Sequence, residues 1–344
     1  MRDSRIIAVG HKMDRIRICD IAEELGVSTA TVSNVLHGKK SKASDKTIER
    51  VMTLIEEKQY VPSMAAILLA QNTSQIIGVF VNDHDKYEGH TLEDFFISSS
   101  LNYLSEEIEA RNLFMMVKKT KTVQEILQFA SMWNMEGIVI IGFCEQDYMY
   151  LRNHMRIPFV VYDGFCEHPE RFVNITIDNY DGGYQVGKYF KDNGHKKVLC
   201  IADNNICMDR ERYQGFSDGF DSADVPFFLI PMQKDERWEY YKKNLSMFKN
   251  VSGVFAVSDY YACDLICFLH SKGFSIPKDI SVVGFDDTPM CKMVLPTLTS
   301  VRQDSALRAK LALDKLAELK ENPNEIGETE IVLPVSLVVR DSSI

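Results

Sequence analysis

The sequence predicts an α/β protein in which a small head of three helices precedes a body of two subdomains, each built around a parallel sheet. Three observations predict this architecture. Short helices without intervening strands come first, and apolar strands then alternate with amphipathic helices from Ser74 onward. The alternation runs through two similar series. The chain has 344 residues, of which 45% are hydrophobic, so it can bury more than one core.

Composition and segment lengths exclude several classes of protein. No apolar run approaches the roughly 20 residues of a membrane span, and the first dozen residues lack the apolar core of a signal peptide. We therefore expect a cytoplasmic protein with no membrane partner. The eight cysteines are scattered and form no Cys-x-x-Cys pair. Packing thiols are expected, although Cys263 and Cys267 share a helix face and leave a metal pair as the alternative.

Charge is distributed unevenly along the chain. Residues 1–62 carry eleven basic and nine acidic side chains, a net charge of +2, whereas the rest carries −12, which gives the total of −10. A mildly basic head on an acidic body suits a module that faces phosphates and is attached to a part that avoids DNA. A solvated face of mixed charges is the alternative explanation.

The head is predicted to contain a helix-turn-helix. A first helix over Ile18–Leu25 ends at Gly26, and Ser28 is a good N-cap for a second helix over Thr29–Leu36. A third helix begins near Ser44 or Asp45. The second helix has small polar residues on its outer face, as a helix that enters the major groove requires. An ordinary helical hairpin, the alternative, needs no such face.

The run from Asp20 to Gly38 resembles the head of the lactose/galactose-repressor family of bacterial transcription regulators. The resemblance implies that Thr29 and Ala30 contact bases of double-stranded operator DNA. Asn34 stands where the family has an arginine that reads guanine, and asparagine pairs with adenine instead. The full set of implied DNA contacts is Ser28, Thr29, Ala30, Thr31, Ser33, Asn34, His37, Tyr60 and Leu69.

The segment after Pro62 is helix-forming but too short to be stable alone in water. The resemblance implies a hinge helix that folds when two subunits pair over the minor groove, with Leu69 wedged between base pairs. Ile67 stands where the family has a basic residue. A core helix of the next domain is the alternative.

The body is expected to consist of two similar α/β series. Strands are expected at Ile76–Val81, Phe114–Val117, Gly137–Ile141, Pro158–Tyr162, Val198–Ile201, Phe227–Ile230, Gly253–Val257 and Ile280–Gly284. Helices are expected at Leu92–Ala110, Val123–Trp133, Tyr180–Asn193, Asp209–Phe220, Arg237–Met247, Asp259–Lys272 and Ser305–Leu319. Because ligands lie outside the carboxyl ends of parallel strands, two such sheets would clamp a small molecule between them.

The body resembles the same family and hence the periplasmic sugar-binding fold, on stretches that include Ile157–Asp163, Arg212–Phe216 and Ile276–Asp287. The resemblance implies a division into an extension (1–15), a DNA-binding domain (16–62), a hinge and linker (63–73) and an effector-binding and dimerisation domain (74–344). The N-subdomain is expected at about 74–174 and 302–328, and the C-subdomain at about 175–301 and 329–344.

Residue types in the cleft suit a neutral polyol, which needs carboxylates, arginine or amide donors and an aromatic face. The family's effector positions are matched by Asp163, Arg212 and Asp259, with Gln303 in a crossover segment and Trp238 near a ring-stacking position. The alternatives are an N-cap for Asp259, a surface ion pair for Arg212 and core filler for Trp238. The complete expected effector set is Asp83, Phe96, Asp163, Arg212, Trp238, Asp259 and Gln303.

The loop after the first strand, from Asn82 to Phe96, departs from the family pattern because it is longer, acidic and carries histidines. His84 and His90 with neighbouring aspartates leave a metal site as an alternative to a solvated loop. No metal and no cofactor are predicted.

Together these features predict a homodimeric transcription repressor whose operator affinity is controlled by a small effector, a sugar or sugar derivative. No dinucleotide-binding, phosphate-loop or nucleophile-elbow motif occurs, so no enzyme is predicted. The alternative is a cytoplasmic binding protein or enzyme on the same body with a non-functional head.

Overall fold

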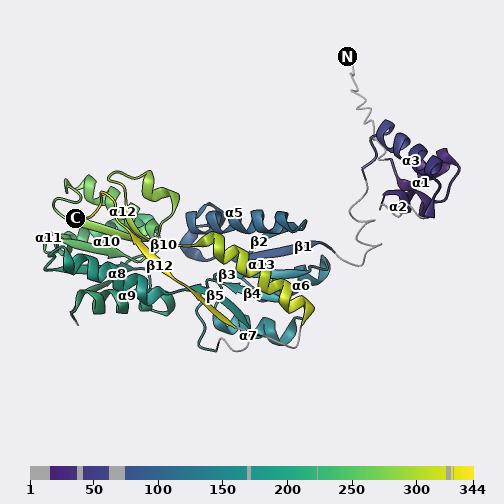
Figure 1. Ribbon diagram of the computed structural model, residues 1–344. Coiled ribbons are helices and arrows are strands. Elements are labelled where there is room, and N and C mark those ends of the chain that lie inside the picture. Colours follow the sequence, from purple (N-terminus) through teal and green to yellow (C-terminus); the bar gives the residue numbers. More distant parts are fainter. Residues whose placement is uncertain are drawn as a thin grey trace, which may run out of the picture. The chain divides into compact units, whose positions relative to one another are not determined.

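The computed structural model describes residues 16–36, 42–61, 74–168, 172–222, 224–322, 327 and 329–344. The chain divides into two units, Met1–Thr73 and Ser74–Ile344 (Figure 1). The expected extension, the hinge and the predicted contacts of His37 and Leu69 lie outside the described residues.

Three helices form the first unit: α1 (Ile18–Leu25), α2 (Thr29–Leu36) and α3 (Asp45–Glu57). Gly26 ends α1 in the left-handed conformation, with φ of 68°, and Val27 N–H then bonds to the Ala22 carbonyl. Ser44 caps α3 through a hydrogen bond from Thr47 N–H. The buried core is Ile21, Ala22, Val32, Val35, Val51 and Leu54. The predicted helical head is thereby confirmed.

The body contains two six-stranded sheets. The sequence predicts two such sheets but only four strands for each of them. The first has the order β11-β5-β4-β3-β1-β2, and all of its neighbouring strands are parallel. Its strands are β1 (Ile76–Asn82), β2 (Phe114–Thr120), β3 (Gly137–Ile141), β4 (Phe159–Tyr162), β5 (Val173–Ile177) and β11 (Glu330–Leu333).

The second sheet has the order β12-β10-β9-β8-β6-β7 and is parallel except for β12, which runs antiparallel to β10. Its strands are β6 (Val198–Ala202), β7 (Phe227–Leu229), β8 (Gly253–Ala256), β9 (Ser281–Asp286), β10 (Thr299–Gln303) and β12 (Val335–Val338).

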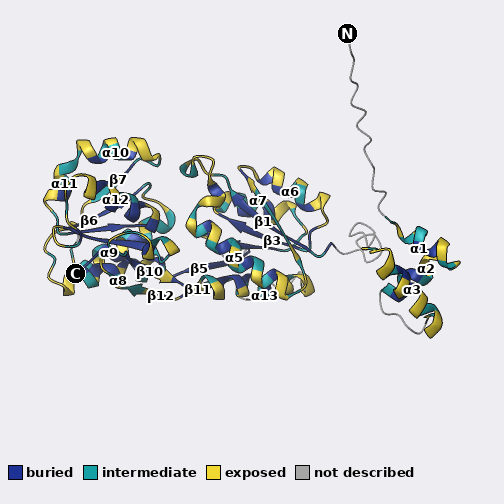
Figure 2. Ribbon diagram, turned by 90° about the horizontal axis from the view of Figure 1, so that it is seen from above, coloured by how far each residue is buried: buried dark blue, intermediate teal, exposed yellow. Residues whose placement is uncertain are grey.

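Helices cover both faces of each sheet, so the strands between them are buried (Figure 2). The first sheet packs against α5 (Phe95–Ala110), α6 (Val123–Met132), α7 (Glu145–His154) and α13 (Ser305–Glu321). The second packs against α8 (Asn179–Asp192), α9 (Cys207–Phe220), α10 (Lys234–Lys243), α11 (Leu245–Lys249) and α12 (Asp259–Ser271).

The chain crosses between the subdomains three times, near Asp178, Asp304 and Pro334. Figure 1 shows its last strands running from one sheet to the other. The expected subdomain boundaries differ, because β5 extends to Ile177 and β11 pairs with β5 in the first sheet. The pairing of β11 with β5, which is distant in sequence, leaves no local signal. The prediction therefore assigns residues 329–333 to the C-subdomain, whereas they belong to the first sheet.

Two helices of the second subdomain approach each other through glycines. A Cβ atom on Gly183 of α8 would lie 1.9 Å from the Arg212 carbonyl oxygen, and one on Gly215 of α9 would lie 1.9 Å from the Tyr180 carbonyl oxygen. Gly187 and Gly219 make equivalent approaches one turn later. Because any side chain would push the helices apart, these glycines fix the position of α9, which carries Arg212.

Candidate functional site

The head presents the outer face of α2. Ser28 Oγ accepts a hydrogen bond from Thr31 N–H at 3.1 Å and so caps the helix. Thr29 and Ala30 are exposed at its start, whereas Ser33 and Asn34 are half-buried. Tyr60 is half-buried against the core of the head. The face of α2 is therefore narrow and polar at its N-terminal end, where helices that read DNA contact base edges.

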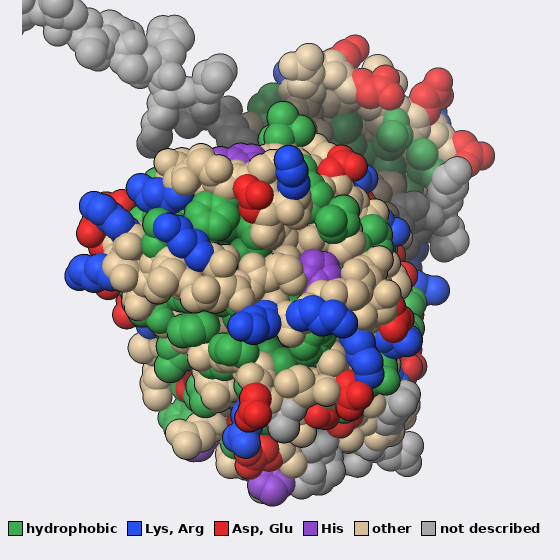
Figure 3. Space-filling model, turned by 90° about the vertical axis from the view of Figure 1, so that its left-hand side faces the viewer, with side chains coloured by type: hydrophobic (Ala, Val, Ile, Leu, Met, Phe, Trp, Pro, Cys, Tyr) green, Lys and Arg blue, Asp and Glu red, His purple; other side chains and the backbone are tan. Residues whose placement is uncertain are grey.

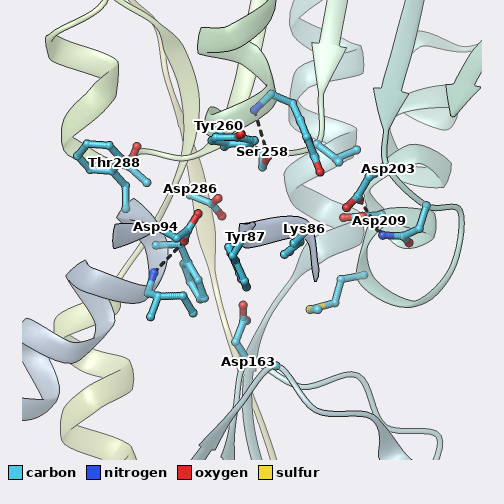
Figure 4. A pocket seen from close by; sticks show the side chains of 18 of the residues that line it. Lys86, Tyr87, Asp94, Asp163, Asp203, Asp209, Ser258, Tyr260, Asp286 and Thr288 are labelled. Carbon is cyan, nitrogen blue, oxygen red and sulfur yellow. Dashed lines mark hydrogen bonds between the residues drawn. The ribbon is translucent and has the colours of Figure 1, made fainter. Parts of the chain in front are cut away.

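The body holds a cavity of about 550 Å³ between its two subdomains (Figure 4). Side chains that follow β1, β3 and β4 line it from the first sheet, and side chains that follow β6, β8 and β9 line it from the second. This is the carboxyl-end position at which parallel sheets bind ligands.

Acidic side chains outnumber basic ones in the lining of this cavity. Among the described residues, seven carboxylates line it, against one lysine, one arginine and one histidine. The acids are Glu88, Glu93, Asp94, Asp163, Asp203, Asp209 and Asp286. The face of the body drawn in Figure 3 differs, since basic and acidic side chains are interspersed there.

A buried chain of polar contacts connects two of these carboxylates across the crossover from β10 to α13. Arg308 Nη1 lies 3.2 Å from Asp163 Oδ1, and Arg308 Nη2 donates to Gln303 Oε1. Gln303 Nε2 in turn donates to Asp286 Oδ1. Asp163 belongs to the first subdomain and Asp286 to the second, so Arg308 and Gln303 link the two halves of the cavity.

Arg212 is held rigidly in the wall of the cavity. Its Nε donates to Asn179 Oδ1 at 2.8 Å, and its Nη1 donates to the Val257 carbonyl at 2.7 Å. The guanidinium carbon lies 3.7 Å from the centre of the Phe285 ring. Stacking and two hydrogen bonds fix the charge in one orientation, which is the use that proteins make of arginine in ligand recognition.

Lys86 enters the cavity from the loop between β1 and α5, near Asp203 and Asp209 (Figure 4). Burial lowers the pKa of Lys86, but Tyr87, Asp203 and Asp209 outweigh it and raise that pKa. Burial raises the pKa of Asp209 to about 6, against the opposing effect of Arg212. Burial likewise raises the pKa of Asp286 well above its usual range, and neighbouring carboxylates add to the shift. Burial therefore shifts Asp209 and Asp286 toward their protonated, neutral forms.

The comparisons with known proteins agree with both parts of this description. Residues 17–63 match the model of the bacterial regulatory proteins of the lacI family, and residues 188–343 match that of the periplasmic binding protein-like domain. The HTH-type transcriptional repressor PurR of Mannheimia succiniciproducens is 27% identical over 338 residues, covering 94% of this chain and 98% of the relative. The chain belongs to the lacI family.

Other relatives and solved structures extend the likeness over nearly the whole chain. The HTH-type transcriptional regulator DegA of Bacillus subtilis is 27% identical, covering 95% of this chain and 97% of the relative. The Lac repressor dimer bound to operator shares the fold with a TM-score of 0.81 at 22% identity, covering 96% of this chain and 99% of that structure. This lacI-family chain is accordingly a DNA-binding transcription regulator with an effector-binding body, and its relatives are regulators, not enzymes.

Three of the effector residues expected in this lacI-family chain line the cavity: Asp163, Phe96 and Arg212. Arg212 is buried, so the alternative of a surface ion pair is wrong. The residues that the sequence analysis missed include Lys86, Tyr87, Asp94, Asp203, Asp209 and Asp286. A usable signal existed, because Asp203 and Asp286 stand at or just after the carboxyl ends of β6 and β9, as Asp163 does after β4.

The other four expected effector residues lie outside the lining of the cavity. Asp259 is buried and accepts hydrogen bonds from Thr288 N–H and Ser300 Oγ, so it supports the wall instead of capping α12, which Ser258 caps. Trp238 is core filler, since it packs against Phe268 and donates to Asp264.

Asp83 and Gln303 do not line the cavity, and their side chains bond to neighbouring protein groups instead. Asp83 accepts a hydrogen bond from Thr91 Oγ1 at 2.5 Å and lies 3.3 Å from Lys119 Nζ, which braces the loop after β1. Gln303 belongs to the polar chain described above. Sequence position brought both residues near the cleft, but their side chains are directed to protein partners.

The two metal sites left open as alternatives gain no support. No three His, Cys, Asp or Glu side chains of the described residues come together in a way that could hold a metal ion. His84 caps a short 3₁₀ turn, η2 (Asp85–Tyr87), and His90 bonds to Glu93. Within the same residues, no helix has the length and hydropathy to cross a membrane.

Proposed function

We propose that this chain is a cytoplasmic transcription repressor that binds a near-palindromic operator as a homodimer and changes its affinity when a small effector occupies the cavity. The observation that carries the proposal is a ligand-sized cavity lined by both subdomains, in a chain that also has an exposed DNA-reading helix face. Two heads would read two half-sites, as helix-turn-helix dimers do.

The proposed effector is a hydroxylated molecule, a sugar or sugar derivative. Carboxylates accept pairs of hydroxyl hydrogens, and Tyr87 and Phe96 supply aromatic faces in the same cavity. Proteins of this fold have been solved with cellobiose and with ribose, each at 21% identity to this chain. A purine, which the PurR relatives suggest, is the competing class, and the same two rings would stack on it.

The proposed control acts through the relative position of the two subdomains. A ligand that contacts Asp163 on one side and Asp286 on the other favours the arrangement in which both reach it, and Arg308 and Gln303 connect these groups through the crossover. Operator affinity changes only by the ligand's difference in affinity for the two arrangements. The three crossovers would transmit the change to the first subdomain, whose strand β1 follows the head in the chain.

A gel-shift experiment with the DNA upstream of the chain's own gene tests the regulator role. The full-length protein is expected to retard this DNA selectively. Ala30→Glu places a negative charge on the exposed start of α2 and should weaken retention more than tenfold, because phosphates and base edges repel it.

The control variant is Glu56→Gln on the exposed part of α3, which should bind at least as tightly as the wild type. Retention that is unselective, or that Ala30→Glu leaves unchanged, would count against DNA recognition by α2.

A further inference from the structure

A hydrogen bond joins the two subdomains at the edge of the cavity. Glu88, in the loop between β1 and α5, accepts it from Lys234 N–H at 3.1 Å. Lys234 is the first residue of α10, in the second subdomain. Among the described residues, the other hydrogen bonds between the subdomains lie at the crossovers, as does the bond from Asp178 N–H to the Leu333 carbonyl. The Glu88 bond is therefore a link apart from the crossovers.

This bond satisfies a donor at the N-terminus of α10. The first N–H groups of a helix have no partner inside it, and the N-cap residue Gln233 supplies no side-chain hydrogen bond. Glu88 supplies the acceptor from the opposite subdomain. The helix itself is fixed to the second subdomain, because its buried Arg237 donates to Asp264 of α12 at 2.7 Å. The bond therefore connects the loop to a firmly held helix.

The same loop is anchored to the first subdomain. Lys119 of β2 donates to the Gly89 carbonyl at 2.9 Å and lies 3.3 Å from Asp83. Glu88 and Gly89 both have left-handed backbone conformations, with φ of 50° and 86°, so the chain turns sharply where it meets α10. Residues 83–94, called the strap below, thus extend from one subdomain to the other.

The strap also faces the cavity. Lys86 and Tyr87, which directly precede Glu88, line the cavity, and Figure 4 shows both side chains in it. The part of the strap that a ligand would touch is therefore next to the part that bonds to the opposite subdomain.

We propose that the strap holds the subdomains together across the cavity through the bond from Lys234 N–H to Glu88. A ligand that contacts Lys86 or Tyr87 would keep the strap in its bonded position, and this consequence rests on the proposed role of the cavity as the effector site. A single exposed hydrogen bond shifts an equilibrium by about threefold to tenfold. The strap therefore biases the arrangement of the subdomains without locking it.

Lys234→Pro removes the donor of this bond. Proline is well tolerated at the first position of a helix, and Gln233 before it is extended, as a residue that precedes proline prefers. Lys234 is exposed and lies outside the lining of the cavity. The matched control is Lys234→Ala, which loses the same side chain, including its approach to the Trp238 ring, but keeps the N–H group.

Two measurements on the full-length protein without ligand distinguish the strap from the cavity. Hydrogen–deuterium exchange followed by mass spectrometry reports the order of the strap. Modification by fluorescein maleimide reports access to the cavity, because Cys207 lines it, and the exposed Cys19 of the head is the internal reference. In Lys234→Pro the strap should exchange, and Cys207 should react, about threefold faster than in the wild type, with Cys19 unchanged. Lys234→Ala should match the wild type in both measurements.

Glu88→Ala removes the acceptor of the same bond and should reproduce both effects. Faster exchange of the strap with unchanged modification of Cys207 would show that the bond acts only locally, which overturns the proposal. Wild-type behaviour of Lys234→Pro and Glu88→Ala, or an equal effect of Lys234→Ala, overturns it as well. The operator experiment above involves none of these residues, so a failure of the regulator role would be seen separately.

Discussion

Single carboxyl groups in the cavity are expected to make the stability of the protein depend on pH. Burial raises the pKa of Asp209 from 3.8, the value of an ordinary aspartate, to about 6. The charged groups around it are Arg212, Asp203 and Lys86. The folded state thus holds a proton that the unfolded state has lost, and stability falls as the pH rises from about 4 to about 6.

Asp209→Asn should remove this penalty. Its free energy of unfolding should exceed that of the wild type by at most about 3 kcal/mol at pH 7.5, and by only about 1 kcal/mol at pH 4.5. Urea unfolding of both proteins at the two pH values measures the difference. A gain that is the same at both values would show that Asp209 is ionised normally.

Arg308 is expected to be the most sensitive residue of the polar chain. Arg308→Met should destabilise the protein by about 3–5 kcal/mol, because the buried Asp163 carboxylate loses its ion-pair partner. Adding Asp163→Asn should recover a large part of the loss, since the uncompensated charge is then gone. Denaturant unfolding of the single and double variants checks this, and losses that simply add would argue against the pair.

Arg212→Ala should abolish the response to effector and leave DNA binding intact, because Arg212 lies in the wall of the cavity and not in the head. Arg210→Ala removes an exposed arginine from the same helix and serves as the control. Fluorescence anisotropy with operator DNA, with and without a sugar that stabilises the wild type, measures both properties. A surviving response in Arg212→Ala would place the effector elsewhere.

At this scale the sequence located part of the cavity. Asp163 and Arg212 are predicted because they match effector positions of the family, and they stand next to a strand end and on the first turns of a helix. Asp259 has the same kind of position, but its two carboxylate oxygens accept hydrogen bonds from Thr288 N–H and Ser300 Oγ and do not face the cavity. Lys86 was missed because its loop has no regular period, so its direction depends on tertiary contacts that no local pattern records.

At the scale of elements, the close contact between α8 and α9 gives the clearest prediction about stability. Gly183→Ala places a Cβ atom against the Arg212 carbonyl, where the distance would be 1.9 Å, so α9 must move. The melting temperature should fall by several degrees, and sugar binding should weaken because Arg212 moves with its helix.

Lys188→Ala on the exposed face of α8 is the matched control and should leave both properties near the wild type. Thermal unfolding followed by calorimetry measures the two variants. An unchanged Gly183→Ala protein would show that the helices have room to separate.

Local patterns predicted the elements with strong periodicity and missed those defined by distant partners. The helices α1 and α2 and the strand β3 were predicted to their ends, because caps, Gly26 and an unbroken apolar run mark them. The strands β5, β10, β11 and β12 and the helix α7 were not predicted. The edge strands β11 and β12 are partly exposed, so their composition resembles that of loops.

At the scale of the whole molecule, a head with a net charge of +2 and a body with −12 have separate tasks. We expect the head to attract phosphates and to present the outer face of α2, and the acidic body, seven of whose carboxylates line the cavity, to be repelled by DNA. Two sites in one chain become a regulator only when ligand in one changes the affinity of the other.

DNase footprinting of the full-length protein on the DNA upstream of its own gene tests that claim most directly. Two symmetric half-sites should be protected, with their centres about one helical turn or a multiple of it apart. A sugar that binds the cavity should shift the protein concentration needed for protection. DNA that stays unprotected at every base, or protection that no cavity ligand alters, would contradict the account.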